Sequence, residues 1–271
     1  MKDAIKISGL KKSYGSKLVL GGLDFQIKQG EIFALLGVNG AGKTTTLECI
    51  EGLRKYDEGT IVINGKTGIQ LQSSSLPAHI KPMEAIKLFS KWNHTDIDTA
   101  MLKALGIKEI KQSQYLQLST GQKRRLHLAL ALISNPDVIF LDEPTAGLDV
   151  EGRLSLHEQI RKLKSQGKTI VLASHDMTEV ESLCDRIAIL NSGKIIFCGS
   201  PSELTEKLGR KYFIHLKTQE REDTYETDTI EDSLISLLEE CKQNNIQILD
   251  IKVDRGTLEQ HFIQMARRGS E

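Results

Sequence analysis

Short apolar runs rich in β-branched residues recur along the chain, and most are followed by a turn signal. They predict strands at residues 5–7, 18–27, 32–36, 61–63, 138–141, 170–173, 187–190 and 195–197. Helical spacing of apolar residues lies between several of them, at 45–51, 152–165 and 177–184. Strands alternating with helices predict an α/β layer with a mainly parallel sheet. The first strands have no helix between them, so we expect an antiparallel β subdomain added to that layer.

The middle of the chain, about residues 73–134, has a different pattern. No convincing strand occurs there, and Leu and Ile recur at three- and four-residue spacing in segments 83–92, 97–105 and 121–133. We therefore expect a helical subdomain inserted between two strands of the sheet.

A third pattern begins near Pro201. Segments 211–216 and 246–253 are predicted strands, and 230–241 and 257–267 are predicted amphipathic helices. Between them, residues 219–231 are polar and acid-rich, which indicates a loop or an edge hairpin. Residues 201–271 carry five more acidic than basic side chains, whereas residues 1–200 carry five more basic ones. This shift predicts a core domain over 1–204 and a small α+β accessory domain over 205–271.

The composition of the chain argues against several classes of protein. The 271 residues include 36 Lys and Arg against 36 Asp and Glu, a balance that argues against a nucleic-acid partner. No apolar run approaches the ~18 residues that cross a bilayer, and the N-terminus lacks an apolar signal core. The four cysteines show neither CxxC nor zinc spacing, so we expect reduced thiols in a cytosolic protein.

A glycine-rich segment carries the strongest chemical signal. Residues 37–44 match G-x-x-x-x-G-K-[ST], between the predicted strand EIFALL and the helix TTTLECI. Glycines let successive backbone N–H groups wrap an anion, and the helix N-terminus adds partial positive charge. Lys43 is expected to reach the β- and γ-phosphates, and the Thr44 hydroxyl to bind Mg²⁺. The expected phosphate-binding residues are Gly37, Val38, Asn39, Gly40, Ala41, Gly42, Lys43, Thr44 and Thr45.

Two carboxylates end a later apolar strand, in the segment VIFLDE. Ligands of doubly wound sheets bind beyond the carboxyl ends of the strands. Asp142 is therefore a candidate ligand for Mg²⁺, directly or through water. Glu143 is a candidate general base for the attacking water.

Together with these motifs, residues 118–122, LSTGQ, resemble the signature LSGGQ of ATP-binding subunits of ABC transporters. The resemblance covers residues 1 to about 200 and includes the order of the motifs. The segment 146–149 is similar to the D-loop, His175 to the switch histidine, Gln72 to the Q-loop glutamine, and Tyr14 to the aromatic residue that stacks on adenine.

The resemblance implies the ABC-type P-loop NTPase fold, ATP hydrolysis, and a head-to-tail dimer with two ATP molecules at the interface. Each site then combines the phosphate loop of one subunit with the signature of the other. Glu143 and His175 are the implied catalytic residues, and Thr44, Gln72 and Asp142 the implied Mg²⁺ ligands. Further implied nucleotide-binding residues are Tyr14, Val19, Ser119, Gly121, Gln122 and Asp149.

Some assignments stay open, and two residues depart from the family pattern. Gln70 and Gln72 compete for the Q-loop role, and the following S-S-S-L-P favours Gln72. Thr120 stands where the family more often has Gly, and Ala146 replaces a commoner Ser. Because Glu143 is intact, we expect both sites of a homodimer to hydrolyse ATP.

The LSTGQKRR form, the short helical subdomain and the C-terminal appendage resemble ATPases of ABC-2 type exporters. A separate integral-membrane permease is the implied partner, which places the chain peripherally on the inner face of the cell membrane. We expect a permease helix to dock near residues 72–89 on Leu76, Pro77, Met83 and Phe89, although these side chains could instead pack internally. The alternative function is a soluble ABC-type ATPase acting on ribosomes or DNA. The transported substrate is not encoded in any of these motifs.

Overall fold

The computed structural model describes residues 2–70, 75–174, 176–208, 212–219, 221–255 and 262. The chain divides into two compact units, residues 1–198 and 199–271.

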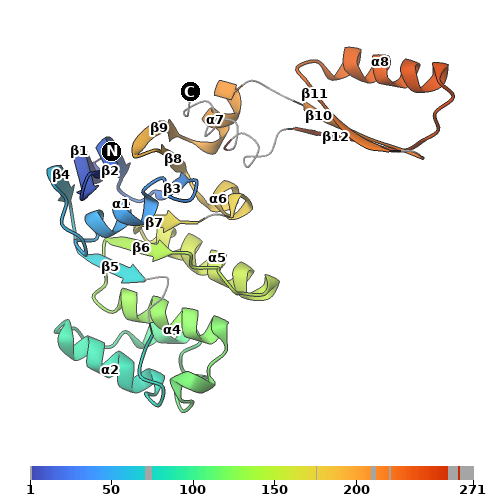
Figure 1. The fold of residues 1–271 in the computed structure, drawn as a ribbon. Coiled ribbons are helices and arrows are strands. Elements are labelled where there is room, and N and C mark those ends of the chain that lie inside the picture. The colour runs from blue at the N-terminus through green and yellow to red at the C-terminus, as the bar shows by residue number, and fades with distance from the viewer. Residues whose placement is uncertain are drawn as a thin grey trace. The chain divides into compact units, whose positions relative to one another are not determined.

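The first unit contains an antiparallel sheet of three strands, in the order β2-β1-β4 (Figure 1). These strands are β1 (Asp3–Tyr14), β2 (Lys17–Lys28) and β4 (Glu58–Ile63). Both β1 and β2 run twelve residues, well beyond the short apolar run that predicted β1, because alternate polar residues continue the ladder. This sheet is the predicted antiparallel β subdomain.

The second sheet of this unit has six strands, in the order β5-β6-β7-β3-β8-β9. Their bounds are β3 (Ile32–Gly37), β5 (Thr67–Gln70), β6 (Val138–Asp142), β7 (Thr169–Ala173), β8 (Arg186–Asn191) and β9 (Lys194–Gly199). The pairs β5–β6, β6–β7, β7–β3 and β3–β8 are parallel. Strand β3 therefore lies inside the sheet, and the segment after it opens at the edge where ligands of such sheets bind.

Helices cover this framework. Helix α1 (Lys43–Ile50) contacts β2 and β3, and α5 (Val150–Ser165) contacts β7. Helix α6 (Met177–Leu183) follows β7. The inserted subdomain contains α2 (Pro82–Trp92), α3 (Thr99–Ala104), the 3₁₀ turn η1 (Tyr115–Gln117) and α4 (Thr120–Leu132), with α4 packed on α2 and β5 (Figure 1).

Buried apolar side chains from both sheets and α1 form one core. Phe33, Phe140, Ile5 and Leu35 are among its members, and each is at most 1% exposed. Burial of aliphatic and aromatic side chains on this scale is the main favourable contribution to folding. The core fixes β3, β6 and β7 against each other and so fixes the loops that follow them.

The second unit contains α7 (Pro201–Leu208), β10 (Tyr212–Thr218), β11 (Glu222–Thr227), α8 (Ile230–Gln243) and β12 (Ile248–Arg255). Strand β10 is central and pairs antiparallel with β11 and β12. Residues 222–227, in the segment predicted as a loop or edge hairpin, are the edge strand of this hairpin. The predicted domain boundary at residue 204 falls within α7. Along the chain, the division between the two compact units lies between residues 198 and 199, where β9 ends. The segment 257–267 lies outside the described residues except Phe262, which is helical.

Candidate functional site

The glycine-rich segment forms a loop between the end of β3 and the start of α1. Gly42 caps α1 with φ 108°, and no side chain caps this helix. The first N–H groups of a helix have no partner within the helix, so those of α1 are available to an anion. A Cβ on Gly42 would lie 2.8 Å from Leu20 Cδ2 and 3.2 Å from the carbonyl oxygen of Val19. The loop therefore requires glycine here for both its backbone conformation and its close packing.

Lys43 folds back over this loop. Its Nζ donates to the carbonyl oxygens of Gly37, at 2.5 Å, and of Val38, at 3.2 Å. Burial lowers the pKa of Lys43, and the nearby charges of Glu143 and Asp142 oppose that shift. A half-buried ammonium group beside backbone carbonyls and two carboxylates is placed to exchange these contacts for phosphate oxygens. The exposed part of the loop comprises Val38, Asn39 and Gly40, and Thr44 is exposed on the first turn of α1.

The two carboxylates lie at the end of β6, next to the end of β7. Asp142 pairs with Ala173 across the parallel ladder, and the backbone N–H of Glu143 donates to the Ala173 carbonyl at 2.9 Å. Glu143 has φ 48°, which is the left-handed region that residues with a Cβ rarely adopt. Such a conformation costs on the order of 1–3 kcal/mol and is concentrated at functional sites. The turn directs the chain away from the strand immediately after Asp142.

A third carboxylate, that of Glu51, lies near Asp142 and was not singled out from the sequence. It follows α1, and its pKa is raised to about 7 by burial, by Asp142 and by Glu48. A lone Glu at a helix end carries no sequence signal, so only the folded chain reveals its proximity to Asp142. Glu51 therefore lies near the candidate metal ligand Asp142, and the two carboxyl groups oppose each other's ionisation.

The signature residues begin helix α4. Ser119 caps the helix: its Oγ accepts from the Gln122 N–H at 3.2 Å, and Gln122 Oε1 accepts from the Ser119 N–H at 2.9 Å. This capping box follows the pattern S-x-x-Q, which is visible in the sequence. Ser119 and Thr120 are exposed, and Gly121 is half-buried. The start of α4 is thus an ordered, accessible helix N-terminus.

A cavity of about 470 Å³ lies at this helix N-terminus. It brings the signature residues Ser119, Gly121 and Gln122 together with Asp149 of the D-loop. Asp149 caps α5, where its Oδ1 accepts from the Gly152 N–H at 2.8 Å. The described residues that line this cavity include none of the phosphate loop and neither Asp142 nor Glu143. Within one chain, the predicted nucleotide-binding residues therefore form two separate groups.

Tyr14 and Val19 lie on the antiparallel sheet. Tyr14 ends β1 with 43% of its surface exposed, and Lys12 Nζ and the Arg54 guanidinium lie 5.6 and 5.4 Å from its ring centroid. Arg54 also pairs with Glu48 of α1, which connects Tyr14 to the helix of the phosphate loop. The Val19 carbonyl is close to Gly42, so both residues border the loop.

Gln72 and His175 lie outside the described residues. The rival Gln70 ends β5, is 2% exposed, and neither polar atom of its side chain has a hydrogen-bond partner among the described residues. Its Q-loop role and that of Gln72 both stay predictions.

The described residues fit a magnesium ion that is bound jointly by the protein and by phosphate, and they do not fit a metal site in which protein side chains supply all the ligands. No three His, Cys, Asp or Glu side chains cluster as metal ligands in the part of the chain that the structure describes. Mg²⁺ is usually held by one or two carboxylates, substrate phosphates and water. Asp142 near the lysine of the phosphate loop, with Thr44 exposed on α1, matches such a donor set.

No helix among the described residues is long and apolar enough to span a membrane.

Comparison with known proteins agrees with this geometry. A family model described as ABC transporter matches residues 20–146. The Nod factor export ATP-binding protein I of Burkholderia orbicola is 38% identical, over 74% of this chain and 72% of its own. The linearmycin resistance ATP-binding protein of Bacillus subtilis is 30% identical, over 97% of this chain and 98% of its own.

A solved structure of an ATP-binding subunit of an ABC transporter matches with a TM-score of 0.69 and 25% identity, covering 76% of this chain and 93% of that one. The α/β fold of this chain, its P-loop and the order of its elements agree with what these relatives indicate. The chain belongs to the ABC transporter family, as an ATP-binding subunit that hydrolyses ATP.

Proposed function

We propose that this chain powers export by a separate membrane permease of the ABC-2 type. Two relatives support an exporter: one is named for Nod factor export and the other for linearmycin resistance. The second of them aligns over nearly the whole chain, so its likeness includes the C-terminal unit. Neither name indicates the alternative, a soluble ATPase acting on ribosomes or DNA.

Two copies of the chain bind two ATP molecules between them in this proposal. The observation that carries it is the separation of the two groups of nucleotide-binding residues within one chain. The signature and Asp149 line an open cavity that no described residue of the phosphate loop enters. A second copy placed head to tail brings its phosphate loop to this cavity, and the N-terminus of α4 then faces the γ-phosphate.

In each composite site, the backbone N–H groups of the loop and Lys43 bind the phosphates, and Tyr14 stacks on the base. Thr44, Asp142 and Gln72 would hold Mg²⁺, which would neutralise charge on the phosphates. Glu143 accepts a proton from the attacking water, and His175 contacts the γ-phosphate and orients that water. Because ATP binds the closed dimer more tightly than the open one, nucleotide binding drives closure.

The permease is proposed to dock on the helical subdomain. A cavity of about 330 Å³ is lined by Leu76 and Phe89 together with Gln70, Asn93 and His127. Leu76, Met83 and Phe89 are half-buried and Pro77 is exposed, so apolar surface remains for a partner helix. Docking there holds the chain peripherally on the inner face of the cell membrane.

The dimer is tested with Glu143→Gln, which removes the proposed base and keeps the shape of the side chain. We expect the purified variant to lose turnover and to form a stable dimer with ATP and Mg²⁺, measured by light scattering. Lys43→Ala, which removes a proposed phosphate contact, should stay monomeric under the same conditions. A monomeric Glu143→Gln at saturating ATP would contradict the composite-site mechanism.

A further inference from the structure

Glu179 on α6 is a buried carboxylate to which no motif assigns a role. It is 3% exposed. A buried carboxylate is costly unless its oxygens receive hydrogen bonds or a cation lies beside it. The groups that contact the Glu179 carboxylate therefore show which segments of the fold it connects.

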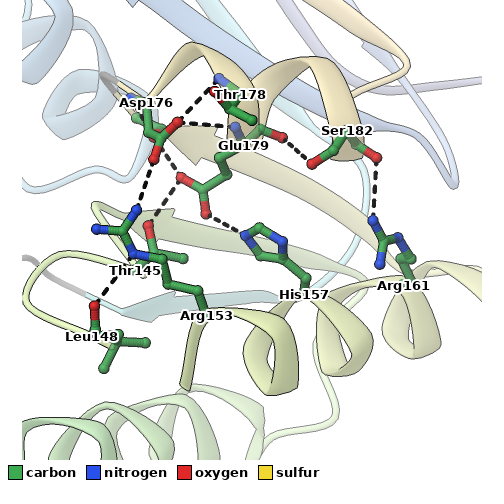
Figure 2. A network of polar contacts seen from close by, with 10 residues as sticks. Thr145, Leu148, Arg153, His157, Arg161, Asp176, Thr178, Glu179 and Ser182 are labelled. Carbon is green, nitrogen blue, oxygen red and sulfur yellow. Dashed lines mark hydrogen bonds and ion pairs between the residues drawn. The ribbon is translucent and has the colours of Figure 1, made fainter. Parts of the chain in front are cut away.

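Each oxygen of Glu179 has a partner on another segment (Figure 2). Oε2 accepts from Ser174 Oγ at 2.5 Å and from Thr145 Oγ1 at 3.2 Å. Oε1 lies 3.3 Å from His157 Nε2 on α5. One carboxylate thus joins the loop after β6, the loop after β7 and helix α5.

A second group of contacts ties the same segments together. Asp176 Oδ1 accepts from the N–H groups of Thr178 and Glu179, and Oδ2 pairs with Arg153 Nη1 at 3.1 Å. Arg153 Nε also donates to the Leu148 carbonyl at 3.3 Å (Figure 2). The D-loop and the start of α6 are therefore both held by α5.

The joined segments flank the proposed catalytic residues. Thr145 follows Glu143 by two residues, and the Glu143 N–H already donates to Ala173, the residue before Ser174. Ser174 immediately precedes position 175. Glu179 therefore adds a side-chain link, through the Thr145 and Ser174 hydroxyls, between the turn that carries Glu143 and the end of β7.

We propose that Glu179 is a positioning residue for hydrolysis, which fixes the loop after β6 to the loop after β7 through Thr145 and Ser174. This inference rests on the proposed catalytic role of Glu143. Displacement of a catalytic group by about 1 Å can lower a rate about a hundredfold, although the displaced residue never leaves the site. The described hydrogen-bond partners of the Glu179 carboxylate include no residue of the phosphate loop, so we expect ATP binding not to depend on it.

The test compares two substitutions of Glu179 in the full chain. Glu179→Leu keeps approximate volume and removes every acceptor, whereas Glu179→Gln retains one oxygen for the two hydroxyls. We expect Glu179→Leu to lower kcat about 10- to 100-fold with KM for ATP unchanged, and Glu179→Gln to stay within about threefold of the native kcat. Glu181→Leu, the same change at an exposed position of α6, is the control.

Thr145→Val tests the same contact without removing the buried carboxylate. It therefore tests the positioning role even if Glu179→Leu fails to fold. We expect it to lower kcat about three- to tenfold, the effect of one hydrogen bond, and to have little effect in a Glu179→Leu background. Native kcat in both Glu179→Leu and Thr145→Val, or fully independent effects of the two, would overturn the proposal.

Glu143→Gln separates this inference from the proposed function. If Glu143→Gln is inactive and Glu179→Leu turns over normally, only the positioning role fails. If Glu143→Gln turns over normally, the catalytic assignment fails, and the positioning role fails with it.

Discussion

Tyr115 and His127 form a hydrogen bond of 2.9 Å inside the helical subdomain, with ring planes at 87°. Burial raises the pKa of Tyr115, and burial, Arg124 and Lys123 lower the pKa of His127. Both shifts favour the uncharged forms of the phenol and the imidazole that share this hydrogen bond. The Tyr115 N–H also donates to the Ile80 carbonyl, so this pair connects the start of the signature helix to the segment where docking is proposed.

The first prediction concerns pH and stability. Because the pKa of His127 is lower in the folded chain than the ordinary 6.5, the unfolded chain binds more protons as the pH falls below about 6.5. The stability contribution of neutral His127 is therefore present above that pH and is lost on acidification. The free energy of unfolding should fall more steeply between pH 7 and 5 in the native chain than in His127→Gln.

Tyr115→Phe is the companion variant for this pair. It removes the hydroxyl group that bonds to Nε2 and leaves His127 in place, so it should lower the free energy of unfolding by about 1 kcal/mol at pH 7.5. Identical acid dependence in the native chain and His127→Gln would show that His127 does not cause the pH effect. Urea unfolding at each pH provides the measurement.

The second prediction concerns Gly42. Gly42→Ala places a Cβ 2.8 Å from a methyl group of Leu20, which is fully buried, and forces an L-residue to φ 108°. We expect a loss of about 1–2 kcal/mol for the backbone and ~1–3 kcal/mol more for the contact. ATP affinity should fall as well, because the loop must shift.

Gly15→Ala is the matched control for Gly42→Ala. Gly15 also has positive φ, at 58°, but a Cβ there meets nothing within 4 Å. It should lose only the backbone part, about 1–2 kcal/mol, with nucleotide affinity unchanged. Equal losses in the two variants, by chemical unfolding, would mean that the loop can accommodate the Cβ.

The third prediction concerns Glu51. Its pKa of about 7 exceeds the ordinary value of 4.5, so the folded chain binds more protons than the unfolded chain between these values. Stability from the protonated carboxyl is fully present below pH 4.5 and is lost as the pH rises through 7. Glu51→Gln should therefore raise Tm at pH 8, without nucleotide or Mg²⁺, and change it little near pH 4.5.

Glu158→Gln, at an exposed position of α5, is the control for Glu51→Gln. It should shift Tm equally at both pH values. A Glu51→Gln variant no more stable than the native chain at pH 8 would indicate that water or a counter-ion relieves the burial of this carboxylate.

Sequence reasoning found the elements whose pattern is local. Strand β3 and helix α1 were predicted because an apolar run, glycines and a Lys-Thr pair are adjacent in the chain. Strand β5 was missed because TGIQ has one large apolar residue, and it exists by pairing with β6. Strand β11 was predicted only as a loop or an edge hairpin, because EDTYET has few apolar residues and exposes every second side chain. It forms a strand by pairing with β10.

The residues of the candidate site also fall into two groups, those that belong to a local sequence motif and those that only folding brings together. The phosphate loop and the acidic end of β6 were visible as motifs, whereas Glu51 and Glu179 were not. Glu179 acts through Thr145 and Ser174, which are 34 and 5 residues away, and no spacing rule relates such positions. The capping role of Ser119 and Gln122 follows from the local pattern S-x-x-Q, whereas the resemblance to the ABC signature implied only their binding of nucleotide.

The last prediction concerns transport. Leu76 lines the cavity of the helical subdomain and is half-buried, so Leu76→Asp places a charge where an apolar partner surface is proposed. We expect ATP turnover of the purified chain to stay near native while permease-dependent export is lost, because an unpaired carboxylate at an apolar contact costs several kcal/mol of binding. Val62→Asp introduces the same charge at a 50% exposed position of β4 that does not line the cavity, and it should leave export intact. Export and ATPase activity measured together in reconstituted vesicles check both expectations, and native export by Leu76→Asp would place the permease elsewhere on the chain.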